Sequence, residues 1–172
     1  MVQPSPGGQH GAKGGAGAAG ALPPEVCILL SEILGRKVTS KKIAPYPFAS
    51  PARRIVAVYE ADDGSPVSIC VCDVALASYA GAALAMIPVG VAKESLAAGQ
   101  CEASLLENFA EILNICTQWF QGHSQHVSPP KLYSSRPEIP AHVAAVLSAP
   151  KSRVDAEIAI PGYGSGQLSI VS

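Results

Sequence analysis

The chain has 172 residues, of which 48% are hydrophobic and 15% are charged, and its net charge is -1. This length and composition predict one domain with a well-buried core. The near-neutral charge argues against nucleic acid and against an anionic membrane surface as the main partner, because both are bound through a basic face.

Residues 1–21 are rich in Gly and Ala. These residues offer little apolar surface to bury, so the conformational entropy lost on ordering them would not be compensated. We therefore expect a disordered tail. The segment has no apolar core of the kind found in a secretory signal peptide. No apolar run in the chain reaches the roughly 18 residues that span a bilayer. We therefore expect a cytoplasmic protein whose folded domain covers residues 22–172.

A first helix is predicted just after this tail. Pro23 and Pro24 fit its first turn, where the missing N–H groups of proline cost nothing. Gly35 is a typical residue for ending a helix. The residues at helical spacing that predict its buried face are Val26, Leu29, Leu30, Ile33 and Leu34.

Residues 38–50 are expected to form a connector, because their prolines argue against a central strand. Residues 54–60 and 66–72 are rich in β-branched side chains and are separated by the turn Ala-Asp-Asp-Gly at 61–64. An Asp-Gly pair between two such segments is typical of a β-hairpin. The sequence therefore predicts two antiparallel strands here.

Asp73 is placed to cap a helix over residues 75–86, whose small side chains predict close packing against a neighbouring element. Pro88 and Gly90 are expected to end this region, and residues 93–98 to form a short helical turn. The longest helical pattern in the chain follows over residues 104–121.

The C-terminal third predicts a short strand at 131–134, a helical turn at 142–147, and a second hairpin from strands 153–160 and 167–171. Strands thus come in antiparallel pairs with helices between the pairs. This order indicates an α+β fold, in which long helices pack on one face of a mostly antiparallel sheet.

We interpret the cysteines and histidines as residues that bind no metal ion. Cys70 and Cys72 share one face of a strand, but no second pair follows at zinc-like spacing, so they are expected to pack as small apolar groups. His123 and His126, with Cys116 on the preceding helix, are an alternative metal set. Carboxylates that would orient the imidazoles are not evident, so we expect no metal and solvated histidines. All five cysteines are expected to be reduced: Cys27, Cys70, Cys72, Cys101 and Cys116.

The long helix carries two different faces. Its predicted buried stripe consists of Leu105, Phe109, Ile112, Leu113, Cys116 and Phe120. Its opposite face carries Glu107, Glu111, Asn114 and Gln118. Glu111 and Asn114 are three residues apart, so their side chains lie together. An Asn side chain can hold a water molecule without taking its proton, and a Glu can pair with a cation. On spacing alone, however, exposed Glu and Asn are usually solvated surface.

The segment Glu111-Ile-Leu-Asn114 resembles the E-x-x-N signature of the CheC/CheX/FliY chemotaxis phosphatases. The order of the surrounding elements is also similar to that of a CheX-like domain: an N-terminal helix, a hairpin at 54–72, a small-residue helix, the long helix and a closing hairpin. The resemblance covers about residues 22–171. It implies a sheet with long helices on one side.

The resemblance also implies an activity, namely hydrolysis of the aspartyl phosphate of a CheY-like response regulator. Glu111 would pair with the regulator's lysine, and Asn114 would orient the attacking water. The regulator would supply Mg²⁺, so the chain would need no cofactor of its own. CheX-type members tend to be homodimers.

Two positions depart from the family pattern. Gln118 stands where the family often has Gly, and its side chain would either obstruct docking or add a polar contact. Glu32-Ile-Leu-Gly35 has Gly in place of a second Asn, which is compatible with a single-site, CheX-type member. Two alternatives therefore stay open: a catalytically silent binding or dimerisation module of the same fold, and a structural domain tethered by its tail.

Overall fold

The computed structural model describes residues 22–48, 52–121, 126–134 and 138–172, and the predicted tail lies outside these ranges. The helices of the described chain are α1 (Pro24–Leu34), α2 (Val74–Leu84), α3 (Val89–Ala97), α4 (Ala103–Phe120) and α5 (Ala141–Ser148). The strands are β1 (Thr39–Lys42), β2 (Arg54–Glu60), β3 (Pro66–Asp73), β4 (Lys131–Tyr133), β5 (Arg153–Ile160) and β6 (Gly164–Val171).

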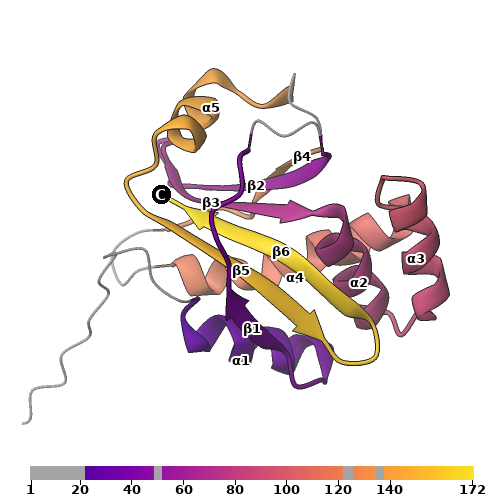
Figure 1. Ribbon diagram of the computed structural model, residues 1–172. Coiled ribbons are helices and arrows are strands. Elements are labelled where there is room, and N and C mark those ends of the chain that lie inside the picture. The colour runs from indigo at the N-terminus through magenta and orange to yellow at the C-terminus, as the bar shows by residue number, and fades with distance from the viewer. Residues whose placement is uncertain (1–21, 49–51, 122–125, 135–137) are drawn as a thin grey trace, which may run out of the picture.

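The strands form one six-stranded sheet in the order β1-β5-β6-β3-β2-β4, and every neighbouring pair is antiparallel. Both predicted hairpins, β2–β3 and β5–β6, are present and pair with each other through β3 and β6 at the centre of the sheet (Figure 1). The prediction of an α+β fold with a mostly antiparallel sheet is confirmed.

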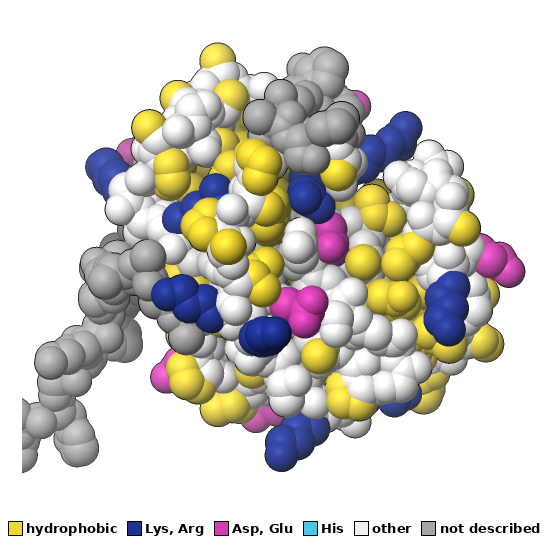
Figure 2. All heavy atoms as spheres, viewed as in Figure 1, with side chains coloured by type: hydrophobic (Ala, Val, Ile, Leu, Met, Phe, Trp, Pro, Cys, Tyr) yellow, Lys and Arg dark blue, Asp and Glu magenta, His cyan; other side chains and the backbone are white. Residues whose placement is uncertain are grey.

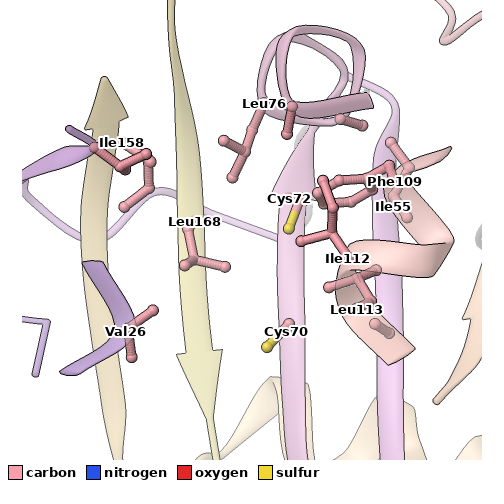
Figure 3. Packing of buried hydrophobic residues seen from close by; sticks show 14 of the residues in the cluster. Val26, Ile55, Cys70, Cys72, Leu76, Phe109, Ile112, Leu113, Ile158 and Leu168 are labelled. Atoms are coloured by element: carbon pink, nitrogen blue, oxygen red, sulfur yellow. The ribbon is translucent and has the colours of Figure 1, made fainter. Parts of the chain in front are cut away.

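One face of the sheet carries the main core and the long helices. Val26 of α1, Leu76 of α2 and Phe109 of α4 belong to a single buried cluster with Cys70 and Cys72 of β3. Figure 3 shows these helices directing their side chains at the same face of the sheet. Long helices therefore pack on one face, as predicted, and α4 lies in this layer beside α2.

The short helix α5 packs on the opposite face, which the sequence did not predict. Val143 of α5 is fully buried against Val58, Ile69 and Val71. Figure 1 shows α5 set apart from the group formed by α1, α2 and α4. Because successive strand residues point to opposite faces, β3 buries Ile69 and Val71 on one side and its cysteines on the other.

Two predicted boundaries were wrong. The expected connector contains β1, whose Thr39 pairs with Ala159 of β5. All four residues of β1 are exposed, so the sequence shows no apolar alternation there, and the open edge of β5 induces the strand. The helix α3 begins at Val89 instead of near residue 93. Pro88 is its N-cap and Gly90 lies in its first turn, so these residues start a helix where a break was predicted.

The small residues of α2 allow close contact with α4. The Asp73 carboxylate accepts a hydrogen bond from the Leu76 backbone N–H at 2.8 Å, which confirms the predicted cap. A Cβ atom at Gly81 would lie 2.0 Å from the Leu105 carbonyl oxygen of α4. The backbones of the two helices therefore touch at a position that only Gly can occupy.

Charged side chains of both signs are interspersed over the face shown in Figure 2. This surface agrees with the small net charge of the chain. Among the residues that the structure describes, no helix combines the length and the apolar character needed to cross a bilayer.

Candidate functional site

The helix α4 is fixed at its start by a carboxylate cap. Glu102 accepts hydrogen bonds from the backbone N–H groups of Ser104, at 3.1 Å, and Leu105, at 3.3 Å. These bonds satisfy donors that have no partner within the helix. The buried residues of α4 are Leu105, Phe109, Ile112, Leu113 and Thr117. The predicted stripe is therefore confirmed except at Cys116 and Phe120, which are only half-buried.

The middle of α4 is fastened to the sheet by a tyrosine. The Tyr59 hydroxyl group of β2 donates a hydrogen bond to the Leu113 carbonyl oxygen at 2.9 Å. Tyr59 is fully buried, and its ring packs on Phe120, with 4.3 Å between the ring centroids. This contact holds the turn that immediately precedes Asn114. The sequence predicts the strand that contains Tyr59, but a hydrogen-bond partner 54 positions away leaves no local signal.

The polar face of α4 points into solvent. Glu107, Glu111, Asn114 and Gln118 are all exposed. The Asn114 Nδ2 atom donates to the Glu111 Oε2 atom across 3.5 Å. The structure therefore brings the two predicted site residues together on one helical face, as their three-residue spacing requires.

The geometry of this pair restricts its chemistry. With Nδ2 directed at Glu111, the Asn114 Oδ1 atom is the group left to accept a hydrogen bond from a water molecule or a partner. Small-molecule sites are concave and surround their ligand, whereas this pair lies on the exposed face of a helix. The arrangement favours a macromolecular partner that brings its own pocket.

Two side chains border the pair. Gln118 is exposed one turn beyond Asn114 on the same face, as predicted. Ile115 is 37% exposed and is one of the few large apolar side chains of the described chain that reach solvent. Ile115 was not among the predicted site residues, although its position between the polar face and the buried stripe of the helix was a usable signal.

The residues weighed as metal ligands have other environments. Cys70 and Cys72 are buried in the core on the α4 side, and burial raises the pKa of both thiols. Burial also raises the pKa of Cys116, to about 11. The Nδ1 atom of His126 lies 2.8 Å from an Asp62 carboxylate oxygen, and His123 lies outside the described residues. Within the described ranges, no three His, Cys, Asp or Glu side chains are grouped as metal ligands.

Two buried carboxylates of the sheet are engaged in ion pairs. Asp155 accepts two hydrogen bonds from Arg153, at 2.8 and 2.7 Å, and one from the Ser169 hydroxyl group. Glu60 lies 2.5 Å from the Lys131 amine. Each buried carboxylate is matched by a cation, and each is also contacted from a neighbouring strand, Asp155 by Ser169 of β6 and Glu60 by Lys131 of β4. Ser169 faces Asp155 across the predicted β5–β6 hairpin, whereas Lys131 is 71 positions from Glu60, which is why the sequence did not reveal that contact.

Comparison with solved structures identifies the fold. One chain of the FliM–SpeE complex from H. pylori matches with a TM-score of 0.52 and 12% identity, over 86% of this chain and 81% of that chain. FliY from Thermotoga maritima matches with a TM-score of 0.45 and 17% identity, over 84% of this chain and 80% of that chain. A chain of the CheX–CheY–BeF₃–Mg²⁺ complex from Borrelia burgdorferi matches with a TM-score of 0.40 and 14% identity, over 84% of this chain and 90% of that chain. No protein-family model and no curated protein matches the sequence.

The similarity to the FliM–SpeE chain concerns the fold alone, because the two chains are only 12% identical. The predicted α+β fold is therefore confirmed and is shared with the FliM–SpeE chain, but this similarity does not extend to an activity.

Proposed function

We propose that the protein is a cytoplasmic phosphatase that accelerates hydrolysis of the aspartyl phosphate of a CheY-like response regulator. The observation that carries the proposal is the exposed contact between Glu111 and Asn114 on α4. These residues match the E-x-x-N signature, and they lie on the long helix of a CheX-like fold. The regulator binds Mg²⁺, and the phosphatase holds no cofactor.

The proposed chemistry is positioning of water. The water oxygen attacks phosphorus, the bond from phosphorus to the regulator's aspartate oxygen breaks, and the aspartate leaves as a carboxylate. The proton of the water passes to the released phosphate or to solvent. Asn114 accepts a hydrogen bond from the water through Oδ1 and stays neutral throughout. Because an acyl phosphate is already reactive, alignment of the attacking water supplies most of the rate increase.

Glu111 acts in docking. Its exposed carboxylate pairs with the regulator's active-site lysine and so aligns Asn114 with the phosphoryl group. The Tyr59 hydrogen bond to Leu113 supports this by fixing the turn of α4 next to Asn114. A side chain on a rigid helix loses less entropy when it is ordered at an interface than one on a loop.

The test measures the decay of a phosphorylated receiver domain with Mg²⁺ present, with and without this protein. We expect the wild type to accelerate the decay and Asn114→Ala to reduce the acceleration about 100-fold, the effect of a misplaced reactant. Glu111→Lys should weaken binding, because it sets a cation against a cation.

Glu107→Ala is the matched control, since Glu107 is exposed on the same face one turn away and should retain full activity. Unfolding curves of all variants establish that each is folded. If Asn114→Ala matches the wild type, the mechanism assigned to Asn114 is wrong.

A second candidate is a catalytically silent binding or dimerisation module, which Gln118 favours because the family often has Gly at this position. A wild-type protein that binds the phosphorylated receiver without changing its decay would support this candidate. Activity that appears only in Gln118→Gly would identify the Gln118 side chain as the obstruction. Light scattering of the full chain tests independently whether it forms the homodimer that the resemblance to CheX-type members implies.

A further inference from the structure

An apolar cavity of about 50 Å³ lies between α1, α4 and the sheet. It is separate from the exposed pair, since neither Glu111 nor Asn114 lines it. Its walls come from elements that are far apart in sequence, and the residues used below are Leu30 of α1, Ile112, Leu113 and Cys116 of α4, and Cys70 and Leu168 of the sheet.

The cavity wall is uncharged. Every lining residue is aliphatic, aromatic or a cysteine, and burial raises the pKa of the Cys70 and Cys116 thiols, so both are protonated at neutral pH. The Tyr59 hydroxyl group already donates to the Leu113 carbonyl oxygen. A buried water needs two or more polar partners, and this wall offers too few, so we expect the cavity to be dry.

Access to the cavity is through the seam between α1 and α4. Leu29 and Leu30 on α1 are half-buried, as are Cys116, Trp119 and Phe120 on α4, and all of them line the cavity. Only side chains of intermediate exposure therefore separate it from solvent along this seam. Such side chains change rotamer on a fast timescale, which provides an entry path for a small solute.

We propose that this cavity is a binding site for a small, uncharged apolar molecule of a few heavy atoms, which enters between α1 and α4. Size sets the class of ligand: an apolar cavity of about 150 Å³ binds benzene or xenon, so a cavity of about a third of that volume limits the ligand to a single large atom or a few heavy atoms. An ion or polar solute is excluded, because it would lose its hydration without gaining hydrogen bonds.

Binding gains the dispersion contacts that the empty space forfeits. Ile112, Leu113 and Cys116 line the cavity and are the sequence neighbours of Asn114 and Ile115. A bound molecule therefore adds contacts to the inner side of the turn that carries Asn114. This inference does not depend on the proposed phosphatase activity, because it uses no residue of the exposed pair.

The experiment titrates the full chain with dissolved xenon and records methyl proton–carbon spectra. We expect saturable shifts at the methyl groups of Ile112, Leu113 and Leu168, whereas Val143 and Val58 on the opposite face of the sheet stay unchanged. Absence of saturable shifts at Ile112, Leu113 and Leu168 in the wild type would overturn the proposal.

Two variants sharpen the test. Cys116→Leu fills the cavity and should abolish the shifts, whereas the matched control Cys27→Leu changes a half-buried thiol of α1 that does not line the cavity and should retain them. Should thermal unfolding show that Cys116→Leu is not folded, Leu30→Ala replaces it. That variant enlarges the cavity and should bind benzene, and failure to bind benzene would count against the site.

Discussion

The contact between α2 and α4 yields the sharpest prediction about what holds the candidate site in place. Gly81 of α2 is buried, and a Cβ atom there would lie 2.0 Å from the Leu105 carbonyl oxygen and 2.9 Å from its carbonyl carbon. Real Cβ atoms essentially never approach closer than 3.0 Å, so Gly81→Ala forces one helix to move by about 1 Å. The obstructing atoms belong to the backbone, so no rotamer change relieves the clash.

Two opposing free-energy terms set the expected change in stability of Gly81→Ala. Overpacking a core costs about 1 to 3 kcal/mol, and a clash with backbone belongs at the upper end of that range. Ala is a better helix former than Gly by about 1 kcal/mol, which offsets part of the cost. We therefore expect Gly81→Ala to lower the free energy of unfolding by about 2 kcal/mol.

Gly90→Ala is the matched control. Gly90 also lies in a helix, α3, but a Cβ atom there meets no heavy atom within 4 Å. Only the propensity term then applies, so this variant should be as stable as the wild type or up to about 1 kcal/mol more stable. The same chemical change at two helical positions thus isolates the packing term.

Urea unfolding followed by circular dichroism measures both variants. With a slope of about 2 kcal/mol per M, Gly81→Ala should lower the urea midpoint by about 1 M, and Gly90→Ala should leave it within about 0.5 M of the wild type. Equal midpoints for the two variants would refute the close contact between α2 and α4. A loss of stability in Gly90→Ala alone would refute it as well.

Two further predictions concern the buried layer behind α4. Tyr59→Phe removes the hydrogen bond to the Leu113 carbonyl oxygen and should cost about 1 kcal/mol in urea unfolding, and an unchanged midpoint would mean that this bond does not stabilise α4. Burial raises the pKa of the Cys70, Cys72 and Cys116 thiols in the folded protein, to about 11 for Cys116. The stability that these protonated thiols contribute is therefore complete below the ordinary thiol pKa near 9. It is lost as the pH rises through the folded-state pKa values. Unfolding midpoints should therefore fall from pH 8 to pH 10.5, and less steeply in Cys116→Ala; a midpoint independent of pH would contradict the burial of these thiols.

The sequence was sufficient where a residue pattern reports directly on the backbone. Alternation with an Asp-Gly turn identified the β2–β3 hairpin, and helical spacing placed Leu105 and Phe109 on the buried face of α4. The same spacing placed Glu111 beside Asn114, because residues three apart are neighbours on any α-helix. The candidate pair could therefore be predicted without knowledge of the fold.

The sequence failed where an element depends on its neighbours. The strand β1 has no apolar alternation, and it forms because β5 offers an unpaired edge. The packing of α5 on the far face of the sheet likewise depends on Ile69 and Val71 of β3, which are buried on that side. The hydrophobic pattern of the sequence indicates that a side chain is buried, but it does not identify the surface that buries it.

What the sequence alone determined is thus the composition of each face of α4 and the pairing of Glu111 with Asn114. Only the tertiary structure decided that Tyr59 fastens the turn before Asn114 and that a cavity remains between α1, α4 and the sheet. The physical reason is the range of the interaction: helical periodicity is set within a few residues, whereas a hydrogen bond across 54 positions or a packing defect between separate elements exists only once the chain has folded.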